Sequence, residues 1–286
     1  KVDNSDQPKS RWYSGCGIYR HVWLTKAQKM AYIPQWGQYV STTPQGDVKV
    51  KVDYLAHGSK MKLSIRNTVY DADGKVVAKS LGNKVQQLKV KNPQLWDIAK
   101  GYLYTVKSEL VVNGKVMDTA TTTTGFREVK FDTQKGFFLN GRNIKINGVC
   151  EHHDFGCLGA AVNEDAMHRK LTILRDMGVN AIRSSHNPPA PELLNMCDSM
   201  GILVMDESFD MWRRKKSNGD YARFFDEWHK RDLSDLIKRD RNHPSIIMWS
   251  IGNEVLEQWS DAAADTLSLE QANLILNAGH DASTLA

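Results

Sequence analysis

Apolar and polar residues alternate through the first part of the chain, between about residue 38 and residue 124. Several short segments place an apolar side chain at every second position; they are residues 48–54, 60–66, 102–106 and 110–112. A period of two indicates β-strands with one buried face. The dipeptides Asp73-Gly74 and Asn113-Gly114 lie between such segments and favour hairpin turns. About seven short strands in about 90 residues predict an immunoglobulin-like β-sandwich.

After this predicted sandwich, short apolar runs alternate with segments of helical period. Met167, Leu171, Leu174 and Met177 recur at the spacing of one helix face, and Gly178 ends that helix. The expected strands are a first one ending near residue 150 and then 179–184, 202–205 and 245–251, and the expected helices are 163–177, 190–200, 223–241 and 267–276. This alternation predicts a parallel α/β unit, either a barrel or a doubly wound sheet. No Gly-x-Gly-x-x-Gly follows these strands, which argues against a dinucleotide-binding fold.

Polar side chains collect at the carboxyl end of every expected parallel strand. The four clusters are Glu151-His152-His153-Asp154, Arg183-Ser184-Ser185-His186-Asn187, Asp206-Glu207-Ser208-Phe209-Asp210 and Asn253-Glu254. Burying such groups without partners costs several kcal/mol, so a purely structural barrel has no need of them there. Barrel enzymes place their chemistry at this face. Four clusters in register therefore favour the barrel and predict one shared active site.

Individual side chains in these clusters allow more than one interpretation. His152, His153 and Asp154 could bind a metal, but adjacent residues on an extended chain point to opposite faces, which favours hydrogen bonding to hydroxyl groups. Arg183 is expected either to bind ligand or to pair with an acidic residue of the next strand. We predict no metal site and no cofactor.

The third cluster and its surroundings leave further alternatives. Asp206 and Glu207 should alternate in direction, so that one faces the barrel interior and the other the helices. Trp212 lies just past a strand end, where its ring either stacks on a sugar or fills the core. The run 239–241 is predicted to be the charged last turn of its helix rather than a site.

Composition narrows the class of protein. The chain has 286 residues, 41% of them hydrophobic, and a net charge of +5 with Lys and Arg spread along it. No run of about 18 apolar residues is present, so no membrane insertion is expected. The most basic run, 213–216, is predicted to be a solvated loop, so no nucleic-acid partner is expected. The cysteines show no Cys-x-x-Cys spacing, which argues against a zinc ribbon or a disulfide scaffold; they are Cys16, Cys150, Cys157 and Cys197.

Longer motifs resemble glycoside hydrolase family 2. One pattern of that family is similar to residues 180–205, which begin Asn-Ala-Ile-Arg-Ser-Ser-His-Asn-Pro. A second is similar to residues 240–254, Asp-Arg-Asn-His-Pro-Ser-Ile-Ile-Met-Trp-Ser-Ile-Gly-Asn-Glu. Residues 11–20 resemble the close of the family's jelly-roll domain, residues 92–96 a stretch of its immunoglobulin-like domain, and residues 124–127 the entry to its barrel.

The resemblance implies a multidomain β plus α/β protein cut from a longer one. Residues 1–37 would be the C-terminal end of a sugar-binding jelly-roll domain, residues 38–125 the immunoglobulin-like sandwich, and residues 126–286 the N-terminal half of a catalytic (β/α)8 TIM barrel. Periplasmic or secreted localisation is favoured by the family, while homo-oligomer formation stays open. The expected partner is a carbohydrate substrate.

The same resemblance implies a retaining exo-β-glycosidase that hydrolyses terminal β-D-galactosides by double displacement. Glu254 matches the general acid/base, a role that needs a raised pKa. Asn253 matches the residue that hydrogen-bonds the sugar 2-hydroxyl, and Arg183 and His186 match pocket residues. Further substrate contacts are expected from His152, His153, Asp154, Asn187, Glu207 and Trp212.

Two departures from the family pattern limit this expectation. The family's nucleophile is a glutamate on a later barrel strand, whereas Glu257 and Glu270 follow Glu254 too soon, so residues 1–286 alone are predicted to be inactive. The Glu-x-His that binds magnesium in some family members is absent from residues 206–212. The alternatives are a β-glucuronidase or β-mannosidase of the same family, or a non-catalytic carbohydrate-binding module.

Overall fold

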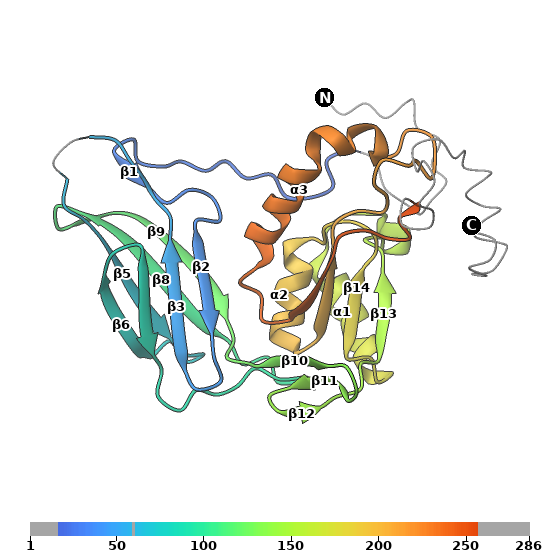
Figure 1. Ribbon diagram of the computed structural model, residues 1–286, viewed down its shortest axis with the longest axis horizontal. Helices are drawn as coiled ribbons and strands as arrows, with labels where there is room; N and C mark the ends of the chain where they lie inside the picture. The colour runs from blue at the N-terminus through green and yellow to red at the C-terminus, as the bar shows by residue number, and fades with distance from the viewer. Residues whose placement is uncertain (1–16, 59–60, 257–286) are drawn as a thin grey trace.

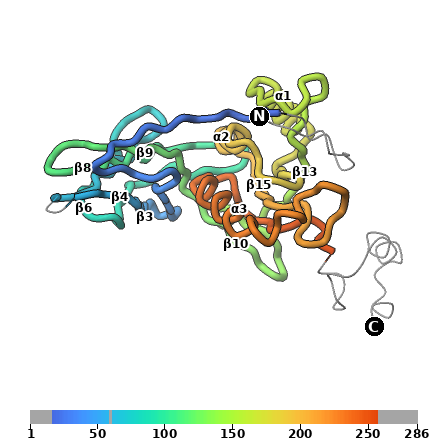
Figure 2. The backbone as a smooth tube through the Cα atoms, turned by 90° about the horizontal axis from the view of Figure 1, so that it is seen from above, coloured from blue at the N-terminus to red at the C-terminus, as the bar shows by residue number. Residues whose placement is uncertain are grey.

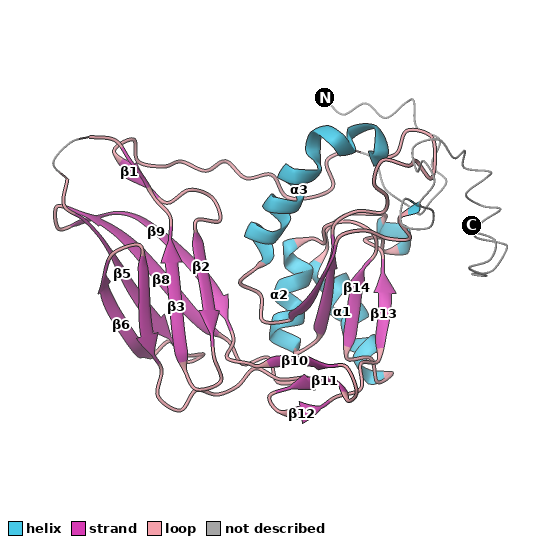
Figure 3. Cartoon of the chain, viewed as in Figure 1, coloured by secondary structure: helices cyan, strands magenta, loops and turns pink. Residues whose placement is uncertain are grey.

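The computed structural model describes residues 17–58 and 61–256, so the helix expected at 267–276 and the motif up to Cys16 lie outside the described residues. Two regions stand side by side, an all-strand sandwich and a mixed region of strands and helices (Figure 1 and Figure 3). No helix among the described residues is long and apolar enough to cross a membrane.

The sandwich consists of two antiparallel sheets with strand orders β2-β3-β7 and β6-β5-β8-β9. Its strands are β2 (Gln38–Thr42), β3 (Asp47–Val52), β5 (Leu63–Tyr70), β6 (Val76–Gly82), β7 (Val85–Lys89), β8 (Tyr104–Val112) and β9 (Lys115–Thr124). In β3 the side chains of Val48, Val50 and Val52 are buried and the residues between them are exposed. Alternation therefore specifies which face of the strand meets the core, and the expected sandwich is confirmed.

The turn between β8 and β9 shows why its sequence was informative. Asn113 and Gly114 are the only two residues between these strands, and both have positive φ, 50° and 84°. Two such residues make the type I′ turn that matches the twist of a hairpin. Gly74, with φ of 78°, lies in the longer turn between β5 and β6. Both expected hairpin turns are confirmed.

The segment before the sandwich runs as an extended strap, defined here as residues 17–30. It carries no helix or strand, and it leads into β1 (Ala31–Tyr32), which pairs with β4 (Leu55–Ala56). Figure 2 shows the strap, in blue, running from the sandwich to the side of the mixed region where α1 and α2 lie.

The mixed region contains a parallel sheet in which each strand pairs with the next along the chain. The strands are β13 (Gly148–Glu151), β14 (Ala181–Ser184), β15 (Leu203–Glu207) and β16 (Ile246–Ser250), and the helices are α1 (Glu164–Asp176), α2 (Pro191–Met200) and α3 (Phe225–Asp240), with short 3-10 turns η1 (Gly156–Leu158) and η2 (Tyr221–Phe224). A doubly wound sheet reverses its strand order at a switch point, and this one does not. The order is that of consecutive barrel strands.

Local signals set the limits of the helices. The Asn163 side chain accepts a hydrogen bond of 2.8 Å from the amide of Ala166 and so caps the start of α1. Gly201, with φ of 68°, ends α2 in the left-handed conformation that favours glycine. The apolar residues Leu171, Ile182, Leu194 and Val204 are buried together between helices and sheet.

The sandwich and the barrel region share buried contacts at the amino ends of the parallel strands. Here a small antiparallel sheet of β10 (Val129–Asp132), β11 (Gly136–Leu139) and β12 (Arg142–Asn143) lies below the barrel strands (Figure 1). Trp96, from the sandwich, is fully buried with Leu139 and Leu203, and its indole N–H donates to the carbonyl of Asp198 at 2.7 Å. Asn242 also bonds the main chain of the edge strand β2, at Val40. These contacts fasten one region to the other.

Candidate active site

The carboxyl ends of β13 to β16 lie along one edge of the parallel sheet. Register pairs Glu151 with Ser184 and Glu207 with Ser250, so the strands end at similar levels. The residues that follow each strand therefore gather at the same edge, as the clusters in the sequence predicted.

Glu207 is the centre of the cluster. Arg183 binds it through two nitrogens, with Nε at 2.9 Å from Oε2 and a terminal nitrogen at 2.8 Å from Oε2 and 2.9 Å from Oε1. His186 Nδ1 lies 2.7 Å from Oε1, and the Ser250 hydroxyl donates to Oε2 at 2.6 Å. The backbone amide of Glu207 itself donates to Ser184 Oγ at 2.9 Å. Since an ionised carboxylate only accepts, His186 Nδ1 carries the hydrogen in this contact.

These donors decide the charge state of Glu207, whose side chain is only 1% exposed. Burial on its own would raise the pKa, but hydrogen bonds from His186, Ser250 and Arg183 outweigh it and hold the pKa of Glu207 below its usual range. Both carboxylate oxygens are engaged by protein donors. Glu207 is thus an ionised residue suited to holding its neighbours in place and unsuited to giving up a proton. Its expected contact with substrate stays a prediction.

Asn253 is held at both ends of its carboxamide. Its Oδ1 accepts from Arg183 at 2.7 Å, and its Nδ2 donates to Asp210 Oδ1 at 2.9 Å. Lys216 donates to the carbonyl of Asn253 at 2.6 Å and to the carboxylate of Asp210 at 3.1 Å. A cation on one end and a carboxylate on the other fix which way the amide points. The contact with Asp210 uses one of the two hydrogens on Nδ2 and does not involve the other.

Glu254 follows directly and differs from Glu207 in exposure and in backbone conformation. Its side chain is exposed, and its backbone has φ of 42°, in the left-handed region that few side chains adopt. The turn before it is tight, since a Cβ on Gly252 would lie 2.9 Å from the Trp212 indole nitrogen and 2.4 Å from a methyl of Val255. The Trp212 N–H donates to the carbonyl of Ile251 at 2.9 Å. Trp212 therefore supports the turn that presents Glu254.

The histidines after β13 point in different directions, as their adjacency predicted. The ring of His152 meets the ring of His186 edge-on, with centroids 5.4 Å apart. The ring of His153 stacks on Tyr19 of the strap at 5.4 Å. Asn187 lines a small cavity together with both histidines. Asp154 is half-buried at the start of the loop that follows β13.

A second pair of acidic residues lies on the other face of β15. Asp206 is fully buried, with the carboxyl group of Asp240 beside it. Burial and the neighbouring Asp240 raise the pKa of Asp206 to about 8. The alternation of Asp206 and Glu207 is therefore confirmed, with Arg183 paired to Glu207.

One sequence interpretation was wrong. The basic run at 213–216, taken as a solvated loop, contains the buried Arg214 and the Lys216 side chain, which is only 7% exposed. Lys216 donates to the carbonyl of Asn253, far along the chain. Residues 239–241 do form the charged end of α3, as predicted, and within it Asp240 is fully buried and binds Arg239 through two contacts of 2.6 Å.

Sequence reasoning missed two residues of the cluster, Ser250 and Lys216, and gave no individual role to Ser184 and Asp210, which belong to the predicted strand-end clusters. Ser250 stands at the end of a short apolar run, and that position was a signal that could have found it. No sequence signal pointed to Lys216, because it lies in a loop whose fold depends on Asp210 and Asn253.

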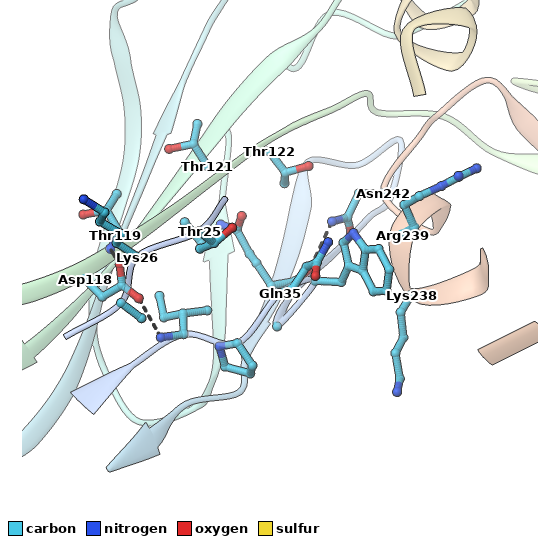
Figure 4. Close-up of a pocket in the computed structure, with 17 residues that line it drawn as sticks. Thr25, Lys26, Gln35, Asp118, Thr119, Thr121, Thr122, Lys238, Arg239 and Asn242 are labelled. Atoms are coloured by element: carbon cyan, nitrogen blue, oxygen red, sulfur yellow. Dashed lines mark hydrogen bonds between the residues drawn. The ribbon is translucent and has the colours of Figure 1, made fainter. Parts of the chain in front are cut away.

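A larger cavity of about 310 Å³ lies elsewhere, between the strap, the sandwich and the end of α3 (Figure 4). Some of its polar lining side chains are engaged by the protein, since Asp118 accepts from the amide of Ile33 at 2.7 Å and Asn242 bonds β2. The strand-end cluster is the better candidate for chemistry, because it combines charged, oriented groups with an exposed carboxylate. Among the described residues, no group of three or more His, Cys, Asp or Glu side chains is placed to hold a metal ion.

The sandwich, the barrel strands and the polar strand ends are those of a multidomain protein built on a (β/α)8 barrel. Residues 129–274 match the family model of the glycosyl hydrolases family 2 TIM barrel domain, and residues 32–127 match a second model of glycosyl hydrolases family 2. The chain belongs to glycosyl hydrolase family 2.

Individual relatives agree. The chain is 57% identical to the β-galactosidase BoGH2A of Bacteroides ovatus, over all of this chain and 35% of that protein. It is 34% identical to a β-glucuronidase of Streptococcus agalactiae, over 70% of this chain and 35% of that protein. A solved β-glycosidase structure from Bacteroides vulgatus superposes with a TM-score of 0.84 at 38% identity, over 96% of this chain and 35% of that one. The chain thus spans about a third of the length of the curated relatives it matches.

Proposed function

We propose that the protein carrying this chain is a retaining exo-β-galactosidase in which Glu254 is the general acid/base. The observation that carries the proposal is the contrast between two glutamates at neighbouring strand ends. Glu207 is buried and saturated with hydrogen-bond donors, whereas Glu254 is exposed and follows the oriented Asn253. Of these two glutamates, Glu254 alone is exposed to solvent, and no donor among the described residues binds it, so it is open to a glycosidic oxygen.

In the proposed reaction, Glu254 protonates the departing oxygen while a glutamate nucleophile from elsewhere in the protein attacks the anomeric carbon. A covalent glycosyl-enzyme forms, and Glu254 then takes a proton from the water that releases the sugar. The remaining N–H of Asn253 would donate to the sugar hydroxyl next to the anomeric carbon. Arg183 and Glu207 would keep that amide in place through the transition state.

The choice of galactose as the sugar has separate support. The relative at 57% identity is a β-galactosidase, while the β-glucuronidase relative is 34% identical. Hydrolysis of aryl β-galactoside, β-glucuronide and β-mannoside by the full-length protein would test this choice. We expect the galactoside to be the fastest, and faster turnover of the glucuronide would overturn the sugar assignment without touching Glu254.

The role of Glu254 is tested by Glu254→Gln in the full-length protein. We expect kcat to fall by about 10²–10⁴, with a smaller fall for substrates whose leaving group needs no proton. Glu227→Gln, at an exposed position in the first turn of α3, is the matched control and should leave kcat unchanged. A uniform loss across all leaving groups would contradict the acid/base role.

A further inference from the structure

The strap crosses the carboxyl edge of the parallel sheet and contacts it at three places. The carbonyl of Tyr19 accepts from the amide of Val162 at 3.4 Å, in the loop between β13 and α1. Arg20 reaches the loop between β14 and α2. His21 Nδ1 lies 2.6 Å from Glu192 Oε1 in the first turn of α2. A segment that precedes the sandwich in the sequence is thus part of the rim around the candidate site.

The Arg20 contacts are directed at main-chain oxygens. One terminal nitrogen donates to the carbonyl of Pro188 at 2.8 Å, and the other donates to the carbonyl of Pro189 at 3.3 Å. The Pro189 carbonyl also accepts from Arg239 at 2.9 Å. Arg239 in turn binds the buried Asp240. Two guanidinium groups, one from the strap and one from the end of α3, therefore hold the same turn of chain.

That turn matters because of what precedes it. His186 and Asn187 lie immediately before Pro188, and His186 contacts Glu207 at 2.7 Å. Proline has no N–H, so this part of the loop has fewer main-chain donors with which to hold itself in place. Hydrogen bonds that Arg20 donates to the carbonyls of Pro188 and Pro189 hold this part of the loop in place instead. Tyr19 acts on the neighbouring loop in the same way, since its ring stacks on His153.

We propose that Arg20 is a positioning residue for the reaction, and that with Tyr19 it fixes the two loops carrying His152, His153, His186 and Asn187 against the sugar site. The proposal rests on the proposed function, because it assigns these loops to substrate binding. Arg20 acts through the carbonyls of Pro188 and Pro189 and does not itself touch the cluster around Glu207. The strap thereby becomes part of the active-site architecture.

The test is Arg20→Met in the full-length protein, with Arg66→Met on the sandwich surface as the matched control. We expect kcat/KM on an aryl β-galactoside to fall about 10-fold or more for Arg20→Met, because small displacements of positioning groups are strongly felt in catalysis. KM should rise as well as kcat fall, because the loops contact bound sugar. A variant that only folds less well would lose active protein and lower kcat with KM unchanged.

Hydrogen exchange gives a readout that does not depend on activity. In Arg20→Met, amides of residues 185–193 should exchange faster than in the wild type, while those of the sandwich strands keep their protection. Arg20→Lys keeps the charge and reaches one carbonyl, so it should recover part of both effects. The proposal is overturned if Arg20→Met keeps kcat/KM and exchange within twofold of the wild type, or if both Arg20 variants fail to fold. A wild-type protein inactive on all three aryl glycosides would instead reject the proposed function, and the exchange measurement would still decide whether the strap holds the loop.

Discussion

The sandwich and the carboxyl edge of the barrel strands bury polar groups in opposite ways. Inside the sandwich they are neutral, as in the row where Gln38 donates to Ser108 at 2.7 Å and Ser108 donates to Asn67 at 2.6 Å. Its charged pairs, such as Arg66 with Glu109, lie at the surface. At the barrel edge charged groups are buried together with neutral ones such as Asn253, and Glu207, bound by the partly buried Arg183, forms the centre.

Stability does not explain this difference. A buried ion pair is often no more stabilising than apolar residues of the same volume, because taking both charges out of water costs several kcal/mol per ion. The sandwich shows that this chain can bury polar groups without charge. The charges at the barrel edge are therefore better understood as a means of orienting Asn253 and presenting Glu254.

The largest effect is expected from Arg183→Met, set against Arg66→Met. Removing Arg183 leaves Glu207 buried and short of a cation, which costs about 3–5 kcal/mol for a fully buried pair. The 27% exposure of the Arg183 side chain places the loss toward the lower end. Arg66→Met should cost about 0–1 kcal/mol, as exposed pairs do. Denaturant unfolding of the full-length proteins measures both, and equal losses would remove the distinction between the two regions.

The next effect depends on pH and concerns Asp206. Its folded-state pKa of about 8 exceeds the ordinary value of 3.8, so the folded protein holds this proton more tightly than the unfolded chain. The resulting stabilisation is complete below about pH 4 and is lost as the pH rises toward about 8. Asp206→Asn has no such titration. Between about pH 5 and pH 8.5 its thermal midpoint should therefore fall less than that of the wild type.

The exposed Asp73 of the sandwich provides the control for that experiment. Asp73→Asn makes the same chemical change at an exposed position of the sandwich and should reproduce the wild-type pH dependence. If Asp206→Asn also follows the wild-type curve, the carboxyl of Asp206 is ionised in the folded protein, and burial beside Asp240 does not raise its pKa.

The smallest effect is expected from Lys216→Met, with Lys215→Met as its neighbour control. Lys216 donates to the Asn253 carbonyl and to Asp210, whereas Lys215 is exposed. Losing a hydrogen bond to a charged group costs about 1.5–3 kcal/mol. We expect about half of this energy to be lost from the orientation of Asn253 in the transition state, which corresponds to about a tenfold fall in kcat/KM. Steady-state kinetics on the aryl galactoside measure it. Identical kinetics for the two variants would show that Asn253 is held well enough by Arg183 and Asp210 alone.

The sequence was most informative where a contact is local. Alternation in β3 identified the buried valines, the Asn113-Gly114 dipeptide located a turn, and adjacency alone separated Asp206 from Glu207. The strand-end clusters were recognised because a short apolar run, whatever its partners, carries its next residues to the edge of the sheet.

What escaped prediction depends on partners far along the chain. Nothing near Asp240 indicates that it is buried, because its surroundings come from β15 and from the loop after β14. Lys216 stands in a run of four basic residues of which Arg213 and Lys215 are exposed, so composition gave the wrong environment for it. Arg20 meets Pro188 and Pro189 across about 168 positions of sequence, and no periodicity records such a contact.

Trp96 shows that the structural boundary between the sandwich and the barrel region does not follow the order of residues along the chain. By position it belongs to the sandwich, yet its ring is part of the floor beneath the barrel strands, and its N–H bonds the chain at Asp198. A barrel excised at residue 126 would expose Leu139 and Leu203 where the indole had been. A chimaera that combines the barrel of this protein with the sandwich of a relative would therefore have to keep the loop around Trp96 together with the barrel.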